Sequence, residues 1–158
     1  MELLPAETEL DLVGDVENES IRRSIVSFSK SYKIIFFGIV DRFRVKEILC
    51  ENKIGIVALH PVPNHISSLP VKMFEYMAAG IPVIASDFPL WKEIIDGNRC
   101  GLCINPFSSR ELADAVIYLL GNTVIAEAMG PNGRAAIPEQ YNWETETINL
   151  LNLYSSLF

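Results

Sequence analysis

Short, almost continuously apolar runs alternate along this chain with longer segments in which apolar positions recur at helical spacing. Runs of this kind are typical of strands that helices cover on both faces of a sheet. Because the connections are short, we expect an α/β fold with a Rossmann-like, doubly wound, mostly parallel sheet and C-terminal helices. The predicted strands are residues 9–14, 33–38, 54–59, 81–86 and 101–104.

Helical periodicity fills the intervals between these strands. Residues 17–30 and 41–51 are predicted helices, as the connections between parallel strands require. In the second helix we expect three apolar side chains to face the interior, namely Phe43, Ile48 and Leu49.

The chain is predicted to be helical after the last strand. Ser108 and Glu111 have the spacing of a capping box at the start of an amphipathic helix. Two more helices are expected at residues 123–130 and 143–157, separated by a segment that contains two prolines. An apolar stripe in the last helix is expected to pack in a core or between domains; its members are Trp143, Leu150, Leu151, Tyr154 and Phe158.

Composition limits the classes of partner. The chain has 158 residues, enough for one domain with a core of its own. Its net charge of −7 and scattered basic residues argue against nucleic acid, because binding a phosphate backbone needs clustered Lys and Arg. No apolar run approaches the ~20 residues that span a bilayer, and no secretion signal is visible at the N-terminus. We therefore expect a cytoplasmic location, with the inner face of the membrane left open.

The cysteines do not form a disulfide framework, since they number three. Cys100 and Cys103 have redox spacing, but a working pair sits at a helix N-terminus, which lowers the pKa of the first thiol. These two lie on a short apolar strand, so we expect reduced thiols without redox function. Zinc ligands would have to come from Cys50, His60 and His65, which have no recognised spacing, so no metal is expected.

The most informative connection is the polar loop at residues 60–70, which contains three prolines. Doubly wound sheets bind ligands at the carboxyl ends of their strands, which is where this loop begins. Ser67 and Ser68 are expected to cap the following helix, with Pro70 in its first turn. The free N–H groups and the positive dipole end at such a helix N-terminus favour a phosphate.

Two charged residues in that helix fit the same kind of ligand. A cation at Lys72, in the first turn, is unfavourable unless a bound phosphate reverses the sign of its interaction with the helix dipole. Glu75 lies among apolar residues, and a ribose diol would supply it with two hydroxyl donors. His65 borders the same region. Ordinary capping, a solvated Lys, a solvated Glu and an exposed loop histidine explain the local pattern equally well, so both interpretations stay open.

Longer motifs surround this helix. Residues 68–87 read Ser-Leu-Pro-Val-Lys-Met-Phe-Glu-Tyr-Met-Ala-Ala-Gly-Ile-Pro-Val-Ile-Ala-Ser-Asp, and Trp91-Lys-Glu-Ile-Ile and Tyr141-Asn-Trp-Glu follow. In this order they resemble the donor-binding C-terminal half of the large retaining GT-B glycosyltransferases, the group 1 or family 4-like glycosyl transferases. The resemblance implies binding of a nucleoside-diphosphate sugar and hexose transfer to a glycan or lipid-linked acceptor. It implies no metal or other cofactor.

The resemblance also assigns roles to residues. Glu75 corresponds to the second carboxylate of the family's Glu-x7-Glu motif and is expected to hold the donor ribose. The first carboxylate falls on Ser67, so the group that usually contacts the transferred sugar is missing here. Lys72 and the backbone at Ser68 and Leu69 are expected near the pyrophosphate.

A second loop is implicated by the same resemblance. Gly38, Ile39 and Val40 follow the second predicted strand and correspond to the loop that packs on the nucleotide base.

The family's C-terminal half opens with a strand ending in Gly-Arg and a later Lys, and this cationic pair stabilises the leaving diphosphate. No such unit precedes residues 9–14. We therefore expect residues 1–158 to be one nucleotide-sugar-binding domain that lacks both the acceptor domain and the first strand-helix unit. Its catalytic residues are unknown, and self-association through the C-terminal helix is expected.

Two alternatives remain. The first is a non-catalytic remnant that folds and binds nucleotide without turnover. The second is a flavodoxin-like or receiver-type domain, which would need an acidic cluster or a flavin loop that we do not find. Dinucleotide-binding, phosphate-loop and hydrolase motifs are absent from the sequence.

Overall fold

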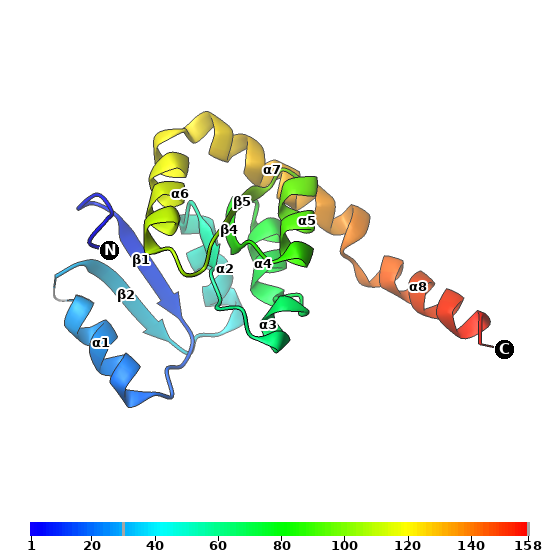
Figure 1. The fold of residues 1–158 in the computed structure, drawn as a ribbon, viewed down its shortest axis with the longest axis horizontal. Coiled ribbons are helices and arrows are strands. Elements are labelled where there is room, and N and C mark those ends of the chain that lie inside the picture. The colour runs from blue at the N-terminus through cyan, green and yellow to red at the C-terminus, as the bar shows by residue number, and fades with distance from the viewer. Residues whose placement is uncertain (30, 158) are drawn as a thin grey trace. The chain divides into compact units, whose positions relative to one another are not determined.

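The computed structural model of the protein describes residues 1–29 and 31–157. Helices alternate with parallel strands along the chain (Figure 1), which confirms the predicted α/β class. The chain divides into two compact units, Met1–Asn52 and Lys53–Phe158, and each is described by itself.

The first unit is a two-stranded parallel sheet with two helices. Glu9 lies opposite Lys33, and the register between the strands shifts after Leu12. Asp41 caps the second helix by accepting a hydrogen bond from the backbone N–H of Arg44 at 2.8 Å. The elements are β1 (Glu9–Val13), α1 (Glu19–Ser29), β2 (Lys33–Gly38) and α2 (Arg42–Glu51).

The predicted first helix included Lys30, which lies outside the described residues. In α2, Ile48 is buried and Leu49 half-buried, but the prediction for Phe43 was wrong, because this side chain is 83% exposed. At 3.6 residues per turn, positions five apart point about 140° away from each other, so Phe43 cannot share the buried face with Ile48.

The second unit contains a three-stranded parallel sheet in the order β3-β4-β5. Its strands and the helices between and after them are β3 (Gly55–Val57), α3 (Pro63–Ile66), α4 (Val71–Ala79), β4 (Val83–Ser86), α5 (Pro89–Gly97), β5 (Gly101–Ile104), α6 (Ser109–Gly121), α7 (Thr123–Gln140) and α8 (Trp143–Ser155). All three predicted strands of this region are present, with β3 and β4 shorter than expected.

The core of this unit lies on both faces of the sheet. Every residue of β4 is buried, which explains its continuously apolar sequence. Val83 and Ala85 pack in one cluster with side chains of α4, α5 and α7. Successive strand residues point to opposite faces, so Ile84 faces the other side, where α6 packs against β4 and β5. Helices on both faces make the sheet doubly wound.

The helix expected at residues 123–130 is longer than predicted. α7 continues to Gln140 through Pro131 and Pro138, so the expected break was wrong. α7 packs against α4, and the two helices approach closely where Gly130 meets the backbone of Gly80. A Cβ atom at Gly130 would lie 2.0 Å from the carbonyl oxygen of Gly80. Tertiary packing of this kind overrides the local tendency of proline to end a helix.

The last helix, α8, has no buried residue between Trp143 and Ser155. Figure 1 shows it extending from the end of α7. Phe158, a member of the predicted apolar stripe, lies outside the described residues. Among the described residues, no single helix combines the length and apolar character needed to cross a membrane; by those two criteria alone, α6 and the helices after it pass only as a pair bent by 99°.

Candidate functional site

The carboxyl ends of β3, β4 and β5 are tied together by hydrogen bonds. Ser86, fully buried at the end of β4, accepts from the backbone N–H of Leu59 at 2.9 Å and donates to the Leu59 carbonyl at 2.8 Å. The backbone N–H of Asp87 donates to the carbonyl of Ile104 at 3.0 Å. The loop that follows β3 therefore starts from a fixed point at the edge of the sheet.

This loop contains the short helix α3, which the sequence did not predict. The expectation that Ser67 and Ser68 cap α4 was wrong. The hydroxyl of Ser67 donates to the Pro63 carbonyl at 2.9 Å, and that of Ser68 donates to the His65 carbonyl at 3.3 Å. Both serine hydroxyls therefore bond to carbonyl groups of α3, and neither caps the N–H groups of α4. Pro70 is the N-cap of α4 and makes no side-chain capping bond.

The two histidines help to shape the same loop. Nδ1 of His65 lies 2.9 Å from the carbonyl oxygen of His60. A carbonyl only accepts, so Nδ1 carries the proton in this arrangement. The ring of His60 lies against Phe107 with centroids 5.1 Å apart.

α4 carries the two charged residues of the predicted site. Lys72 is exposed and Glu75 is half-buried. Residues three apart in a helix share a face, so the ammonium and the carboxylate lie on the same side of α4, near its N-terminus. Burial raises the pKa of the neighbouring Tyr76, and the negative charge of Glu75 adds to that rise. Leu69 is 47% exposed in the segment that leads into the helix.

Trp91 of α5 lies beneath the loop and is the largest fully buried side chain among the described residues. Its indole N–H donates to the carbonyl oxygen of Ser68 at 2.6 Å, and its ring contacts Phe88 with centroids 4.7 Å apart. Trp91 has no predicted role from the sequence. Its residue type is nevertheless a signal, because a buried indole N–H needs an acceptor.

The other predicted residues belong to the first unit. Gly38 ends β2 with φ +66°, a left-handed conformation, and its carbonyl accepts from the backbone N–H of Gly14 at 2.8 Å. Ile39 is 79% exposed and Val40 is half-buried. An exposed apolar side chain after a strand is available to pack on a flat ligand. Within the second unit, the structure groups His65, Ser67, Ser68, Leu69, Lys72 and Glu75 at one corner.

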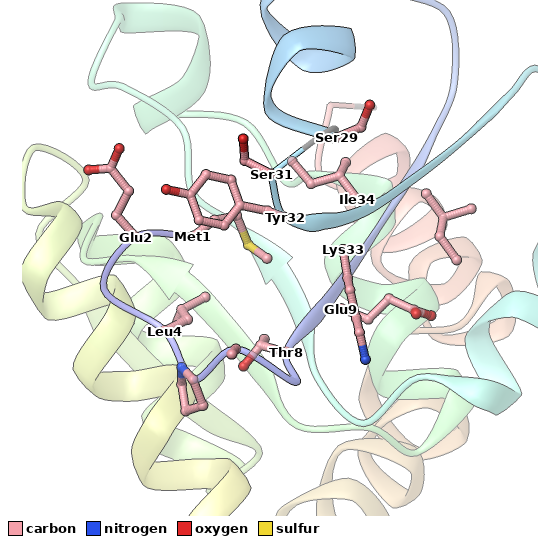
Figure 2. Close-up of a pocket in the computed structure, with 13 residues that line it drawn as sticks. Met1, Glu2, Leu4, Thr8, Glu9, Ser29, Ser31, Tyr32, Lys33 and Ile34 are labelled. Carbon is pink, nitrogen blue, oxygen red and sulfur yellow. The ribbon is translucent and has the colours of Figure 1, made fainter.

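A cavity of about 710 Å³ lies in the first unit, at the amino ends of β1 and β2 (Figure 2). Glu2, Thr8, Glu9, Tyr32 and Lys33 are among the residues that line it. It contains none of the predicted site residues. Ligands of doubly wound sheets bind at the opposite, carboxyl edge, so we do not take this cavity as the site.

The cysteines are free thiols: Cys50 exposed, Cys103 half-buried and Cys100 buried. Burial raises the pKa of Cys100 to about 11 and that of Cys103 to about 11, so neither is an activated nucleophile. Over residues 1–29 and 31–157, no group of three or more His, Cys, Asp and Glu is arranged to hold a metal ion.

The parallel α/β architecture and the loop-helix corner at its carboxyl edge define a Rossmann-like domain. Residues 1–122 match the sequence profile of the family described as Glycosyl transferases group 1. The chain therefore belongs to the group 1 glycosyl transferases, as the sequence motifs predicted.

Individual relatives agree with this assignment. The chain is 26% identical over 157 residues to the phosphatidyl-myo-inositol mannosyltransferase of Mycobacterium leprae; the match covers 96% of this chain and 38% of that protein. The chain thus spans well under half the length of this relative.

Two solved structures share the fold. The C-terminal domain of a group 1 family protein (LpcC) from Francisella tularensis matches with a TM-score of 0.64, 18% identity and 90% coverage of both chains. The Anabaena protein HepE, solved with UDP-glucose, matches with a TM-score of 0.79 and 19% identity over 97% of this chain and 42% of that one. The first match shows that the protein has the fold of a C-terminal domain of this family.

Proposed function

We propose that this chain is the donor-binding part of a nucleotide-sugar-dependent glycosyltransferase. In the whole protein it would serve hexose transfer, with retention, to a glycan or lipid-linked acceptor. The observation that carries the proposal is the placement of Lys72 and Glu75 on one face of α4, beside the loop that starts at the carboxyl edge of the sheet. HepE, which has the same fold, was solved with a nucleotide sugar bound, and this supports a ligand of that class.

In this proposal the N-terminus of α4 receives the diphosphate. The backbone N–H of Leu69 beside Ser68, the positive end of the helix dipole and the ammonium of Lys72 would offset its negative charge. Lys72 and the backbone donors would supply this positive charge, so the proposal includes no metal ion. His65 borders the same corner through its bond to the His60 carbonyl.

The carboxylate of Glu75 would accept hydrogen bonds from the two hydroxyls of the ribose. Charge-assisted hydrogen bonds of this type are about twice as strong as neutral ones. Glu75 is therefore expected to contribute most to recognition of the ribose. Ser67 occupies the position of the carboxylate that other family members direct at the transferred sugar. Its shorter hydroxyl, bonded to Pro63, would leave more room for that sugar. Gly38, Ile39 and Val40 are proposed to contact the base.

Sugar transfer itself is proposed only for the whole protein. The chain spans 38% of its Mycobacterium leprae relative, and a second domain is needed to hold an acceptor in line with the donor. Binding without turnover by the whole protein would instead favour the non-catalytic alternative.

Calorimetry with UDP and GDP tests the binding proposal. We expect weak binding of one of these nucleotides to the 158-residue chain. Glu75→Ala should weaken that binding more than tenfold, about 1.4 kcal/mol, because the ribose loses its acceptor. Glu75→Gln, which keeps the shape and removes the charge, should lose most of the same affinity.

The matched control is Glu127→Ala, which removes an exposed carboxylate from α7. It should bind like the parent. Thermal unfolding of each variant separates loss of the site from loss of the fold. Equal affinity of parent and Glu75→Ala, with both folded, would remove Glu75 from the site.

A further inference from the structure

The loop after β3 is held by the protein at two points, one near each end. At its start, the buried hydroxyl of Ser86 bonds both the N–H and the carbonyl of Leu59. Near its end, the buried indole N–H of Trp91 donates to the carbonyl of Ser68 at 2.6 Å. The two anchoring side chains come from consecutive elements, the end of β4 and the first turns of α5.

Between these points the loop satisfies many of its polar groups internally. The backbone N–H of Ile66 donates to the Val62 carbonyl at 3.1 Å, and that of Ser67 donates to the Pro63 carbonyl at 3.3 Å. The contact between the His65 ring and the His60 carbonyl joins α3 to the segment that precedes it. A segment with its own internal bonds moves as one piece, so its position depends on the anchors at its ends.

We propose that Trp91 is a positioning residue of the nucleotide site, an inference that rests on the function proposed above. Its indole N–H fixes the Ser68 carbonyl and thereby aims the adjoining backbone of Ser68 and Leu69 at the place of the diphosphate. Trp91 does not touch the nucleotide. If the loop moved away, the buried N–H would lose its acceptor, which is unfavourable, so the loop stays in one conformation before the ligand arrives. Preorganisation of this kind raises affinity, because no ordering cost remains at binding.

The chemistry at Trp91 separates a positioning role from simple packing. The ring is fully buried against Phe88, so any large truncation would disturb the core. Replacing the indole by a benzothiophene keeps the bicyclic shape and exchanges only the N–H for sulfur. The chain has two tryptophans, and Trp143 is 80% exposed. In a Trp143→Phe background, biosynthetic incorporation of benzothienylalanine therefore changes position 91 alone.

The experiment compares this analogue protein with its Trp143→Phe parent. Hydrogen exchange should become faster at the amides of Ile66, Ser67 and Ser68, while β4 and β5 keep their protection and the melting temperature changes little. Affinity for UDP or GDP should fall roughly three- to tenfold, the loss expected for one hydrogen bond. Trp91→Phe also removes the N–H but leaves a cavity in the core, so its loss of affinity should be at least as large.

Each result has a distinct meaning. Unchanged exchange in the loop overturns the positioning role, whatever happens to binding. Unchanged nucleotide affinity, in a parent that binds, overturns its link to the site. If the parent binds neither nucleotide, the proposed function fails. The proposed link to that site then fails with it, and loop exchange still decides whether Trp91 fixes the loop.

Discussion

Buried polar atoms determine the geometry of the candidate site at the scale of single residues. Ser86 and Trp91 are both fully buried, and each offers its hydrogen to a carbonyl of the loop after β3. A buried donor without an acceptor costs about 1–3 kcal/mol, so these two contacts constrain the loop more than its exposed residues do. The exposed ammonium of Lys72 therefore lies next to a loop whose position is fixed.

The charged residues of the candidate site could be proposed from the sequence alone, whereas the side chains that hold its loop in place could not. Lys72 and Glu75 belong to a short continuous motif, so their identity could be predicted without a fold. Trp91 reaches a carbonyl 23 residues away, and Ser86 reaches one 27 residues away. Contacts between residues so far apart in the sequence produce no local motif from which they could be predicted. For Ser67 and Ser68, a local pattern was present but misleading. Their sequence is typical of helix capping, yet their hydroxyls donate to carbonyls of α3.

Thiol reactivity should follow burial and pKa. A thiolate is the reacting species, and burial raises the pKa of Cys100 and Cys103 to about 11. At pH 8 in a thiol-disulfide exchange titration, the folded protein should therefore show one fast thiol, Cys50, and two slow ones. The slow pair should speed up as the pH rises towards 11, because the thiolate fraction increases. Denatured protein should react at all three positions.

The control for this titration is Cys50→Ser, which should remove the fast phase and leave the slow one. Two fast thiols in that folded variant would mean that Cys100 and Cys103 are not shielded as the structure indicates.

Most elements follow from the periodicity of apolar residues, and the exceptions are governed by packing between elements. The five strands were predicted from short, mostly apolar runs, and in β4 this pattern follows from burial on both faces. The break before Pro131 was predicted from local chain preference alone. In the folded chain, α7 packs along α4, and Gly80 and Gly130 allow the backbones of the two helices to approach closely. The sequence of α7 alone does not indicate this approach.

Gly130→Ala tests that crossing. Alanine is favoured over glycine inside a helix by about 1 kcal/mol, so an isolated helix would become more stable. Here a Cβ would lie 2.0 Å from the Gly80 carbonyl oxygen, and the two helices would have to separate. We expect a net loss of about 1–3 kcal/mol in the free energy of unfolding, measured in urea.

Gly121→Ala is the matched control, since it lies at the end of α6 and a Cβ there meets nothing within 4 Å. It should be neutral or stabilising. If Gly130→Ala unfolded at the same urea concentration as the parent or at a higher one, the close approach of α4 and α7 would not limit stability.

At the scale of the whole molecule, the predicted site residues are distributed over two compact units. The residues proposed for the diphosphate and ribose lie in Lys53–Phe158, and those proposed for the base lie in Met1–Asn52. Local motifs predict each group, but a motif carries no information about the relative placement of two units. Family membership and the fold were predictable because the motifs extend in order over much of the chain.

The exposed helix α8 leads to a prediction about association. Trp143, Leu150 and Tyr154 are spaced by seven and four residues and form one stripe, and they are 80%, 51% and 56% exposed. Apolar patches of this kind are rare on monomeric proteins beyond a few hundred Å² and invite association. We therefore expect the 158-residue chain to dimerise in sedimentation velocity runs at micromolar to millimolar concentration, by packing this stripe against a second copy.

Two charge substitutions distinguish the stripe from non-specific stickiness. Leu150→Glu places a carboxylate in the stripe and should shift the chain to monomer, because a buried unpaired charge is unfavourable at an apolar contact. Asn152→Glu adds the same charge about 160° away around the helix and should leave association unchanged. A parent that stays monomeric over the whole concentration range, or equal effects of the two substitutions, would show that α8 is not a self-association surface.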